Sequence, residues 1–273
     1  MHKNPQGIPE KRWRPSALVS ASIAVHAAAA AMVVSRPALW PWAVGGVMFD
    51  HFVLTACGLW PRSSLLGPNW TRLPPWAAQG NVAITIDDGP DPEVTPRVLD
   101  ILAKHGVQAT FFCIGERVAA HPELTRTIVR SGHAVENHSQ RHLHRFSLLG
   151  PRAMTAQISE AQDVIATALG EAPRFFRAPA GLRNPFLDPI LARQGLQLAS
   201  WTRRGFDTIA RDSDVVLRRL VRGLHSGDIL LLHDGNASRG PSGAPVILET
   251  LPALLESVAA ASLTPITLRS ALR

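Results

Sequence analysis

The sequence contains no tyrosine, and lysine and cysteine are scarce. The only lysines are Lys3, Lys11 and Lys104, so arginine carries nearly all of the positive charge behind the net charge of +7. The arginines are scattered and are not interleaved with aromatic residues, which argues against a nucleic-acid-binding protein. Cys57 and Cys113 lie in apolar runs without metal-ligand spacing, so they form neither a disulfide framework nor a cysteine metal site.

Two further features are missing. No G-x-G-x-x-G follows the first predicted strand, which removes the support for a dinucleotide-binding domain. No internal repeat is visible. With 273 residues, the chain has room for one large domain, or for a domain with an extension.

Long apolar runs are present near the N-terminus. The first, "PSALVSASIAVHAAAAAMVVS", lies between Arg14 and Arg36. It is apolar and uncharged apart from a neutral His26. A bilayer is crossed by about 20 apolar residues, so this run is long enough to span one. A cleaved signal peptide fits poorly, because the run is longer than the usual hydrophobic region and a second run follows it.

The second apolar run extends from Arg36 to Arg62 but carries Asp50 and His51 near its middle. A carboxylate at the centre of a membrane span costs about 2.5–3.5 kcal/mol on insertion scales. One span and two spans therefore both stay open. The prediction is an N-terminal membrane region over residues 1–61, with apolar helices at about 15–35 and 38–60.

The number of spans decides the side of the membrane on which the rest of the chain lies. The basic residues Lys3, Lys11, Arg12 and Arg14 place the N-terminus in the cytoplasm. A single span puts the remainder outside the cytoplasm, whereas a hairpin of two spans returns it. The predicted location is the inner (cytoplasmic) membrane, with both sides open for the remainder.

Residues 62–80 are rich in Pro, Gly and Trp and are expected to form a linker that lies on the membrane surface or packs under a domain over 81–273. In that domain, short apolar runs alternate with amphipathic segments, which predicts parallel strands joined by helices. We expect an α/β fold, a distorted (β/α)7 barrel one unit short of the triosephosphate-isomerase type; an open doubly wound sheet is the rival. The expected strands lie at 82–87, 109–114, 133–136, 174–177, 196–201, 228–233 and 264–268.

Ionisable residues follow most of these strands. In α/β barrels the carboxyl ends of the strands meet at one face, where the active site lies. We therefore expect one site from residues of five strand ends. They are Asp87 and Asp88, His138 and His142, Arg177, Trp201 and Asp207, and His233.

The spacing of His138 and His142 indicates a metal site. On a helical turn, residues i and i+4 lie on one face, so both imidazoles could hold one ion. Asp88 would complete a two-histidine, one-carboxylate set with open positions, which is typical of catalytic metal sites. A cation would let both adjacent carboxylates stay ionised, with Asp87 free to take a proton from water. Ordinary Asp-Gly-Pro turn chemistry is the alternative interpretation.

Five ordered segments resemble the motifs of the polysaccharide deacetylases, the metal-dependent carbohydrate esterases with NodB homology. They are "TIDDGP", "HSQRH", "RAPAG", "WTRRGFD" (a looser match) and "LLLHD", and the resemblance extends from about residue 81 to the C-terminus. It implies a distorted barrel and hydrolysis of acetyl groups on sugars. It also implies one divalent metal, with zinc expected first and cobalt or another divalent ion as alternatives.

The resemblance also implies roles for individual residues. Asp87 would be the general base, held by Arg177, and His233 the general acid, tuned by Asp207. The metal ligands would be Asp88, His138 and His142, and the substrate would meet the Ala180 N–H, Trp201 and Leu231. The sequence departs from the family at Thr208, where a tryptophan is frequent, and at Ala180, where an aromatic residue is common.

These features predict a carbohydrate deacetylase that removes N-acetyl or other N-acyl groups from an amino sugar in a polysaccharide or glycolipid. A deacetylase or deformylase of a lipid-linked sugar precursor at the cytoplasmic membrane face is one alternative. A non-catalytic glycan-binding domain is another, and a metal-dependent phosphoesterase is disfavoured because ligands for only one metal are visible. No partner protein can be inferred.

Overall fold

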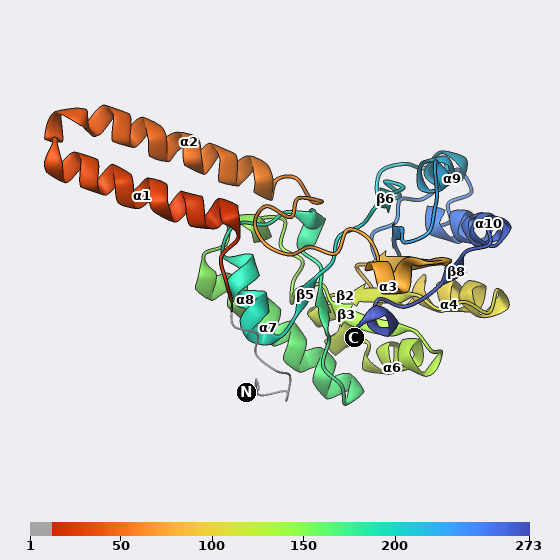
Figure 1. The fold of residues 1–273 in the computed structure, drawn as a ribbon. Helices are drawn as coiled ribbons and strands as arrows, with labels where there is room; N and C mark the ends of the chain where they lie inside the picture. The colour runs from red at the N-terminus through yellow and green to blue at the C-terminus, as the bar shows by residue number, and fades with distance from the viewer. Residues whose placement is uncertain (1–12) are drawn as a thin grey trace.

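A computed structural model describes residues 13–273 of the chain. It has two parts: a two-helix hairpin and a barrel-like body from which the hairpin projects (Figure 1). Lys3, Lys11 and Arg12, on which the predicted orientation of the N-terminus depends, lie outside the described residues.

The body is built on one curled sheet of parallel strands, which confirms the expected α/β barrel-like fold. The strand order is β5-β4-β3-β2-β1-β7-β6, and β8 pairs with the start of β1. Within residues 13–273, β5 and β6 do not pair, so the sheet stays open between them. The strands are β1 (Asn81–Asp87), β2 (Thr110–Cys113), β3 (Ala134–Asn137), β4 (Phe175–Phe176), β5 (Gln197–Leu198), β6 (Arg203–Arg204), β7 (Ile229–His233) and β8 (Thr264–Pro265).

Helices surround this sheet and connect its strands (Figure 1). The longest of them ends at Leu169 with Gly170 in the left-handed conformation (φ 74°), as the sequence predicts for a glycine-capped helix. The α-helices are α1 (Ala17–Ser35), α2 (Trp40–Gly58), α3 (Pro75–Ala78), α4 (Thr95–Lys104), α5 (Gly115–Ala120), α6 (Pro122–Arg130), α7 (Pro151–Leu169), α8 (Leu187–Gln194), α9 (Ser213–Val221) and α10 (Val246–Ala260).

The alternation of side chains along β1 explains both the core and the position of the site. Val82, Ile84 and Ile86 are fully buried against the surrounding helices. Each such side chain stabilises the fold by about 1.5–3 kcal/mol relative to exposure. The alternate residues of the strand face the inside of the sheet. Asp87 is the last of these, so its carboxylate stands at the carboxyl end of the strand.

The segment expected to be a linker packs into the open side of the sheet. The Trp70 N–H donates to the Leu198 carbonyl at 2.9 Å, and the Trp70 carbonyl accepts from the Ser200 N–H at 2.9 Å. Farther along, the Leu73 N–H donates to the Gly227 carbonyl, just before β7. These residues therefore cover the gap that the sheet leaves.

The hairpin consists of α1 and α2, joined by the short 3₁₀ turn η1 (Pro37–Leu39) and packed side by side (Figure 1). Asp50 of α2 is 9% exposed and accepts a hydrogen bond from Ser22 Oγ of α1 at 2.7 Å. Asp50 thus has a hydrogen-bond donor on the neighbouring helix, which lowers the free-energy cost of placing its carboxylate in an apolar run. Of the described helices, α1 alone is long and apolar enough to cross a membrane.

Candidate active site

The predicted site residues meet at the carboxyl ends of the strands. Neighbouring residues of a strand normally point to opposite faces. Asp87 is the last residue of β1, and Asp88 has a positive φ of 76°. This turn lets both carboxylates face the same cavity, so the adjacent pair is not an ordinary loop feature alone.

Asp88 and the two histidines form a compact group of three ligand atoms. Asp88 Oδ1 lies 3.3 Å from His138 Nε2 and 3.3 Å from His142 Nε2. Asp88 Oδ1 is buried and has no hydrogen-bond partner among residues 13–273. One carboxylate oxygen and two imidazole nitrogens that converge on one point suit a divalent cation such as zinc. The structure thus contains a site that fits the metal expected from the sequence.

The histidines reach this arrangement by a different local structure from the one expected. Residues 138–142 form an irregular loop after β3, not a helical turn. Ser139 and His142 have positive φ values of 66° and 48°, and Ser139 Oγ accepts from the His142 N–H at 3.0 Å. The expectation of a shared helical face was therefore wrong, because left-handed residues bend the loop instead.

Hydrogen bonds and burial prepare these ligands for a cation. His138 Nδ1 lies 2.8 Å from the Arg177 carbonyl oxygen, which leaves Nε2 directed at Asp88. Burial lowers the pKa of His142 to about 4, so its ring is neutral at pH 7, as a ligand must be. Although burial opposes it, the nearby histidines hold the pKa of Asp88 well below its usual range.

Asn236 supports the same carboxylate, a contact that was not predicted from the sequence. Its Nδ2 donates to Asp88 Oδ2 at 2.9 Å and so occupies the oxygen that does not face the histidines. Asn236 lies three residues after His233, beyond the last residue of β7. The position of this polar residue just after the end of a predicted strand is the sequence signal that indicates such a contact.

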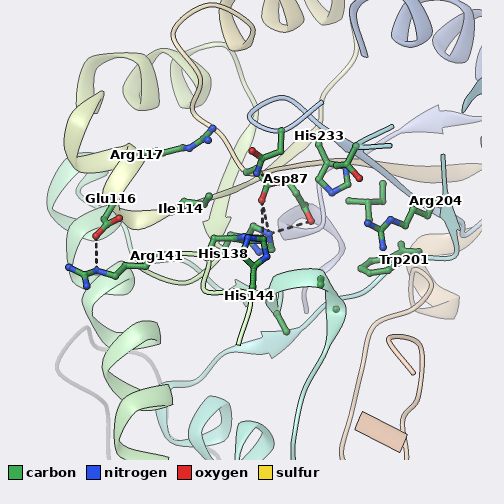
Figure 2. Close-up of a pocket in the computed structure, with 18 residues that line it drawn as sticks. Asp87, Ile114, Glu116, Arg117, His138, Arg141, His144, Trp201, Arg204 and His233 are labelled. Atoms are coloured by element: carbon green, nitrogen blue, oxygen red, sulfur yellow. Dashed lines mark hydrogen bonds and ion pairs between the residues drawn. The ribbon is translucent and has the colours of Figure 1, made fainter. Parts of the chain in front are cut away.

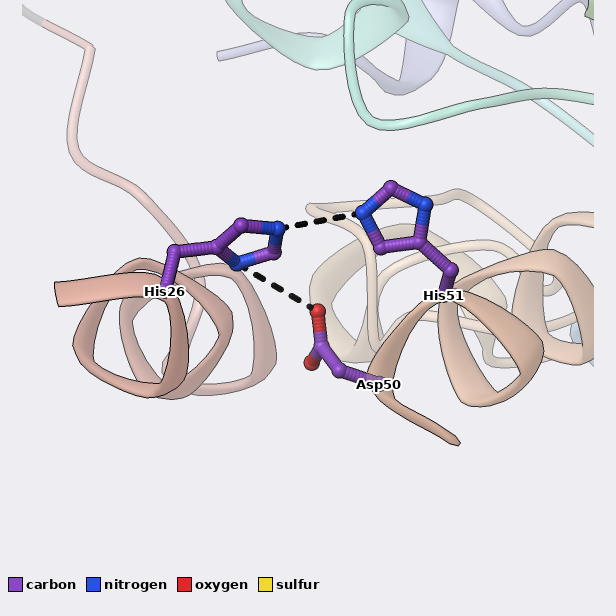
Figure 3. Close-up of side chains that lie close together, drawn as sticks. All are labelled: His26, Asp50 and His51. Carbon is purple, nitrogen blue, oxygen red and sulfur yellow. Dashed lines mark hydrogen bonds and ion pairs between the residues drawn. The ribbon is translucent and has the colours of Figure 1, made fainter. Parts of the chain in front are cut away.

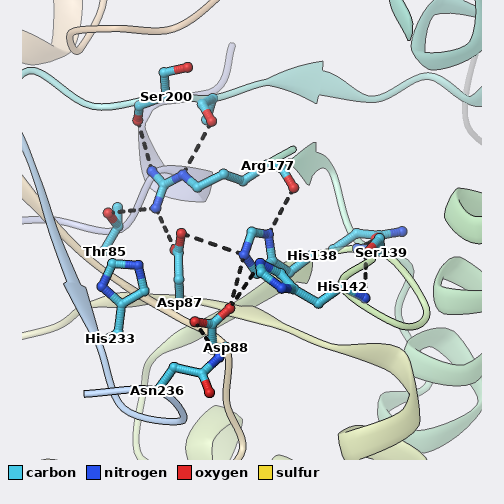
Figure 4. A network of polar contacts seen from close by, with 12 residues as sticks. Thr85, Asp87, Asp88, His138, Ser139, His142, Arg177, Ser200, His233 and Asn236 are labelled. Carbon is cyan, nitrogen blue, oxygen red and sulfur yellow. Dashed lines mark hydrogen bonds and ion pairs between the residues drawn. The ribbon is translucent and has the colours of Figure 1, made fainter. Parts of the chain in front are cut away.

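Asp87 is held by a buried arginine (Figure 4). Arg177 Nη1 donates to Asp87 Oδ1 at 2.6 Å and to Thr85 Oγ1 at 2.8 Å. Its other nitrogens donate to the carbonyls of Ala199 and Ser200. Burial lowers the pKa of Arg177, but the Asp87 carboxylate opposes this effect. The pairing fixes the position of the Asp87 carboxylate beside the three ligands.

His233 lies on the other side of Asp87 from His138 in Figure 4. The ring Nδ1 of His233 is 2.9 Å from Asp207 Oδ1, and the backbone N–H of His233 donates to Asp207 Oδ2 at 2.7 Å. Burial alone lowers the pKa of His233, but the Asp207 carboxylate outweighs it and raises the pKa to about 8. His233 is therefore mainly protonated at neutral pH.

A cavity of about 540 Å³ opens at this site (Figure 2), and its lining includes Asp87, Asp88, His138, His142, His233 and Asn236. The residues expected to contact substrate, Ala180, Trp201 and Leu231, also line it, and so does Thr208. Ala180 has a positive φ of 55°. Four polar side chains that were not predicted from the sequence also line this cavity. They are Glu116, Arg117, Arg141 and His144.

Two adjacent arginines, Arg203 and Arg204, differ in position. Arg203 forms an ion pair with Asp228 and donates to the carbonyls of Arg222 and Gly223, so its guanidinium is occupied. Arg204 lines the cavity and stacks on Trp201, with its guanidinium carbon 5.3 Å from the ring centre. Of these two arginines, Arg204 is therefore the one available to a substrate in this cavity.

Comparison with known proteins identifies the family. The family model for polysaccharide deacetylase matches residues 77–199. A chitooligosaccharide deacetylase of Sinorhizobium fredii is 38% identical over 156 residues, which are 57% of this chain and 72% of the relative. A peptidoglycan-N-acetylglucosamine deacetylase of Bacillus cereus is 34% identical over 184 residues, 66% of this chain and 85% of the relative. The chain belongs to the polysaccharide deacetylase family.

A solved structure agrees with this assignment. The family 4 carbohydrate esterase from Streptomyces lividans, in complex with acetate, superposes with a TM-score of 0.62 at 33% identity. The match covers 69% of this chain and 93% of the esterase. The predictions of the family, of the barrel-like fold and of a carbohydrate deacetylase are confirmed.

Proposed function

We propose that this polysaccharide deacetylase is a metal-dependent amide hydrolase that removes an N-acyl group, foremost N-acetyl, from an amino sugar. One observation carries the proposal: an arginine-held carboxylate and an aspartate-held histidine flank a three-ligand metal site in one cavity. The names of the relatives from Sinorhizobium fredii and Bacillus cereus support a glycan rich in N-acetylglucosamine as the substrate class.

Asp88, His138 and His142 are the proposed metal ligands. A divalent metal held there supplies Lewis acidity, which polarises the acyl carbonyl and makes water a stronger acid. Zinc suits this donor set, and cobalt or another divalent ion is the alternative. The remaining chemistry depends on the side chains around the ligands.

Asp87 is the proposed general base. Arg177 fixes its carboxylate, so Asp87 can take the proton of the attacking water while remaining in place. The backbone N–H of Ala180, at the cavity wall, is proposed to donate to the oxyanion that forms from the acyl carbonyl. A donor of this kind typically contributes about 10²–10³ in rate.

His233 is the proposed general acid. Asp207 binds its Nδ1–H and keeps the ring protonated near neutral pH, so the other ring nitrogen can give a proton to the leaving amine. Leu231 and Trp201 line the same cavity, and we propose that they contact the acyl group and the sugar.

We further propose that the hairpin anchors the protein in the inner membrane, with the barrel on the same side as the N-terminus. Two contacts support this arrangement. Trp13 Nε1 donates to Asp188 Oδ2 at 2.7 Å, and Ser16 Oγ donates to the Leu65 carbonyl at 2.7 Å. They hold the start of α1 against the body. A bilayer between the start of α1 and the body would separate these partners.

With a cytoplasmic N-terminus, this arrangement puts the barrel in the cytoplasm and favours a lipid-linked amino sugar over an extracellular polymer. Deacetylation and deformylation both fit such a substrate. A C-terminal fusion tests the arrangement. A cytoplasm-only fluorescent protein should fluoresce, and alkaline phosphatase at the same position should stay inactive; active phosphatase would contradict it.

The activity itself is tested on the purified full chain in detergent. Acetate release from a soluble acetylated chitooligosaccharide should stop with a chelator and return with zinc or cobalt. A protein that binds the oligosaccharide and the metal but releases no acetate would instead be a non-catalytic glycan-binding domain. The intact base, acid and ligand residues argue against that alternative.

A further inference from the structure

A second group of metal-ligand side chains lies in the hairpin. His26 is near the middle of α1, and Asp50 and His51 are near the middle of α2. Each residue offers one ligand atom, and these atoms all lie within 4.8 Å of one another (Figure 3). None of the three lines the catalytic cavity. We call these three residues the hairpin cluster.

The two imidazoles of the hairpin cluster are arranged as metal ligands are. His26 Nδ1 lies 2.8 Å from the Ser22 carbonyl oxygen, which can only accept, so Nδ1 carries the ring proton. A metal-bound histidine typically donates its other ring N–H to a carbonyl in this way. The lone pair of neutral His26 is then on Nε2, which lies 3.1 Å from His51 Nε2.

This separation of the two ring nitrogens is close to the one that a shared ion requires. Around a tetrahedral zinc ion, with bonds of about 2.0–2.2 Å, the ligand atoms lie about 3.3–3.6 Å apart. His26 Nε2 and His51 Nε2 therefore need to part by only a few tenths of an ångström. Figure 3 shows the Asp50 carboxylate directed at the space beside both rings.

Asp50 supplies a negative charge that lacks a permanent cation. Its carboxylate is nearly buried, accepts from Ser22 Oγ at 2.7 Å and lies 3.7 Å from His26 Nδ1. Within residues 13–273, no lysine or arginine forms an ion pair with it, and His26 is uncharged in the tautomer given above. An ionised carboxylate in an apolar helix pair is costly unless a cation or a donor compensates it. A bound divalent ion would provide that compensation.

An ion has a path to the hairpin cluster. His26 and His51 line a cavity of about 370 Å³ between the hairpin and the body, together with the hydroxyl residues Ser22 and Thr55. A metal site with three protein ligands needs such an entry path and space for a further ligand such as water. The hairpin cluster therefore has both the ligand set and the access of a metal site.

We propose that the hairpin cluster binds one divalent transition-metal ion, with zinc suited to its two imidazoles and one carboxylate. The ion joins α1 to α2 and neutralises Asp50. This site is separate from the catalytic ligand set and does not rest on the proposed function. The alternative is a metal-free contact in which His51 Nε2–H donates to His26 Nε2.

Metal content tests the proposal. The full chain is purified in neutral detergent without a histidine tag, loaded with zinc, freed of excess ion and analysed by mass spectrometry. It should hold about two zinc ions per chain, and His51→Ala and His138→Ala should each reduce this to about one. The double variant should hold none. His105→Ala, which removes an exposed histidine outside both ligand sets, should keep both ions.

A single ion that His138→Ala removes and His51→Ala leaves in place would overturn the proposal and favour the metal-free contact. Cobalt reports on the ligands directly. The His138→Ala chain should show the visible absorption of bound Co²⁺, and adding His51→Ala should abolish it. No cobalt absorption in the His138→Ala chain would also overturn the proposal.

A milder variant guards against unfolding. Asp50→Asn keeps an acceptor for Ser22 and removes the charge, so in the His138→Ala chain it should weaken zinc binding about tenfold or more in competition with a chelator. If His51→Ala loses both ions, this variant decides, and unchanged zinc affinity in it would overturn the proposal. A chain that binds two zinc ions but releases no acetate would contradict the proposed function and leave the hairpin site intact.

Discussion

The catalytic cavity and the hairpin use buried polar groups in opposite ways. In the cavity, Asp87, Asp207 and His233 are held by specific partners inside a closely packed barrel. In the hairpin, Asp50 and its polar partners lie between the two helices. The other faces of these helices expose apolar side chains. The barrel gains its stability from its own core, whereas the hairpin leaves apolar surface to be covered by something else, which we propose to be the membrane.

The comparison predicts that the two regions can be damaged separately. Charge changes at the strand ends should affect metal and turnover without affecting membrane attachment. Charge changes on the hairpin should weaken membrane attachment without affecting metal binding or turnover at the catalytic site.

The largest effect is expected for Asp87→Asn. Loss of the general base should lower kcat by about 10²–10⁴, while bound metal stays, because Asp87 is not a proposed ligand. His138→Ala should lose the metal as well. Metal content by mass spectrometry and acetate release separate the two variants, with the exposed Asp100→Asn as the control. Full activity in Asp87→Asn would refute its assignment as base.

Next in size is Val25→Arg in α1. A charged side chain near the middle of a span costs about 2.5–3.5 kcal/mol on insertion scales, so more protein should leave the membrane fraction during alkaline extraction. The same change at Val129, an exposed valine of the barrel (39% exposed), should leave attachment unchanged. Equal extraction of both variants would mean that α1 is not buried in lipid.

A smaller effect is expected for Asn236→Ala. Partners that orient a ligand typically contribute about 10–100-fold in metal affinity, and Asn236 binds the Asp88 oxygen away from the histidines. Titration with a competing chelator should show weaker metal binding. At saturating metal, kcat should stay close to that of the unsubstituted protein, and a large loss of kcat there would indicate a direct catalytic role instead.

The smallest change is expected in the pH profile of Asp207→Asn. His233 acts as an acid, so kcat should fall as pH rises through its pKa of about 8. Without the Asp207 charge, burial lowers this pKa, and the alkaline limb should move to lower pH by about one unit or more. Glu256→Gln, which removes the charge of an exposed residue on α10, should leave the alkaline limb of the profile at the same pH. An unmoved limb in Asp207→Asn would show that His233 does not set it.

Much of the barrel could be predicted because its signals are local. The alternation of side chains in residues 82–87 indicates a strand. The glycine after Leu169 indicates the end of a helix. The short strand Arg203–Arg204 has no apolar alternation, and only its pairing with β7 makes it a strand. It was therefore not predicted.

The sequence by itself determined the types of residue that gather at the strand ends, because parallel strands bring their carboxyl ends to one edge. Only the tertiary structure decided how they meet: the left-handed turns at Asp88 and His142, and the contact of Asn236 with Asp88. It also decided that the start of α1 lies against the body. These features depend on contacts between residues far apart in the chain, which no local period encodes.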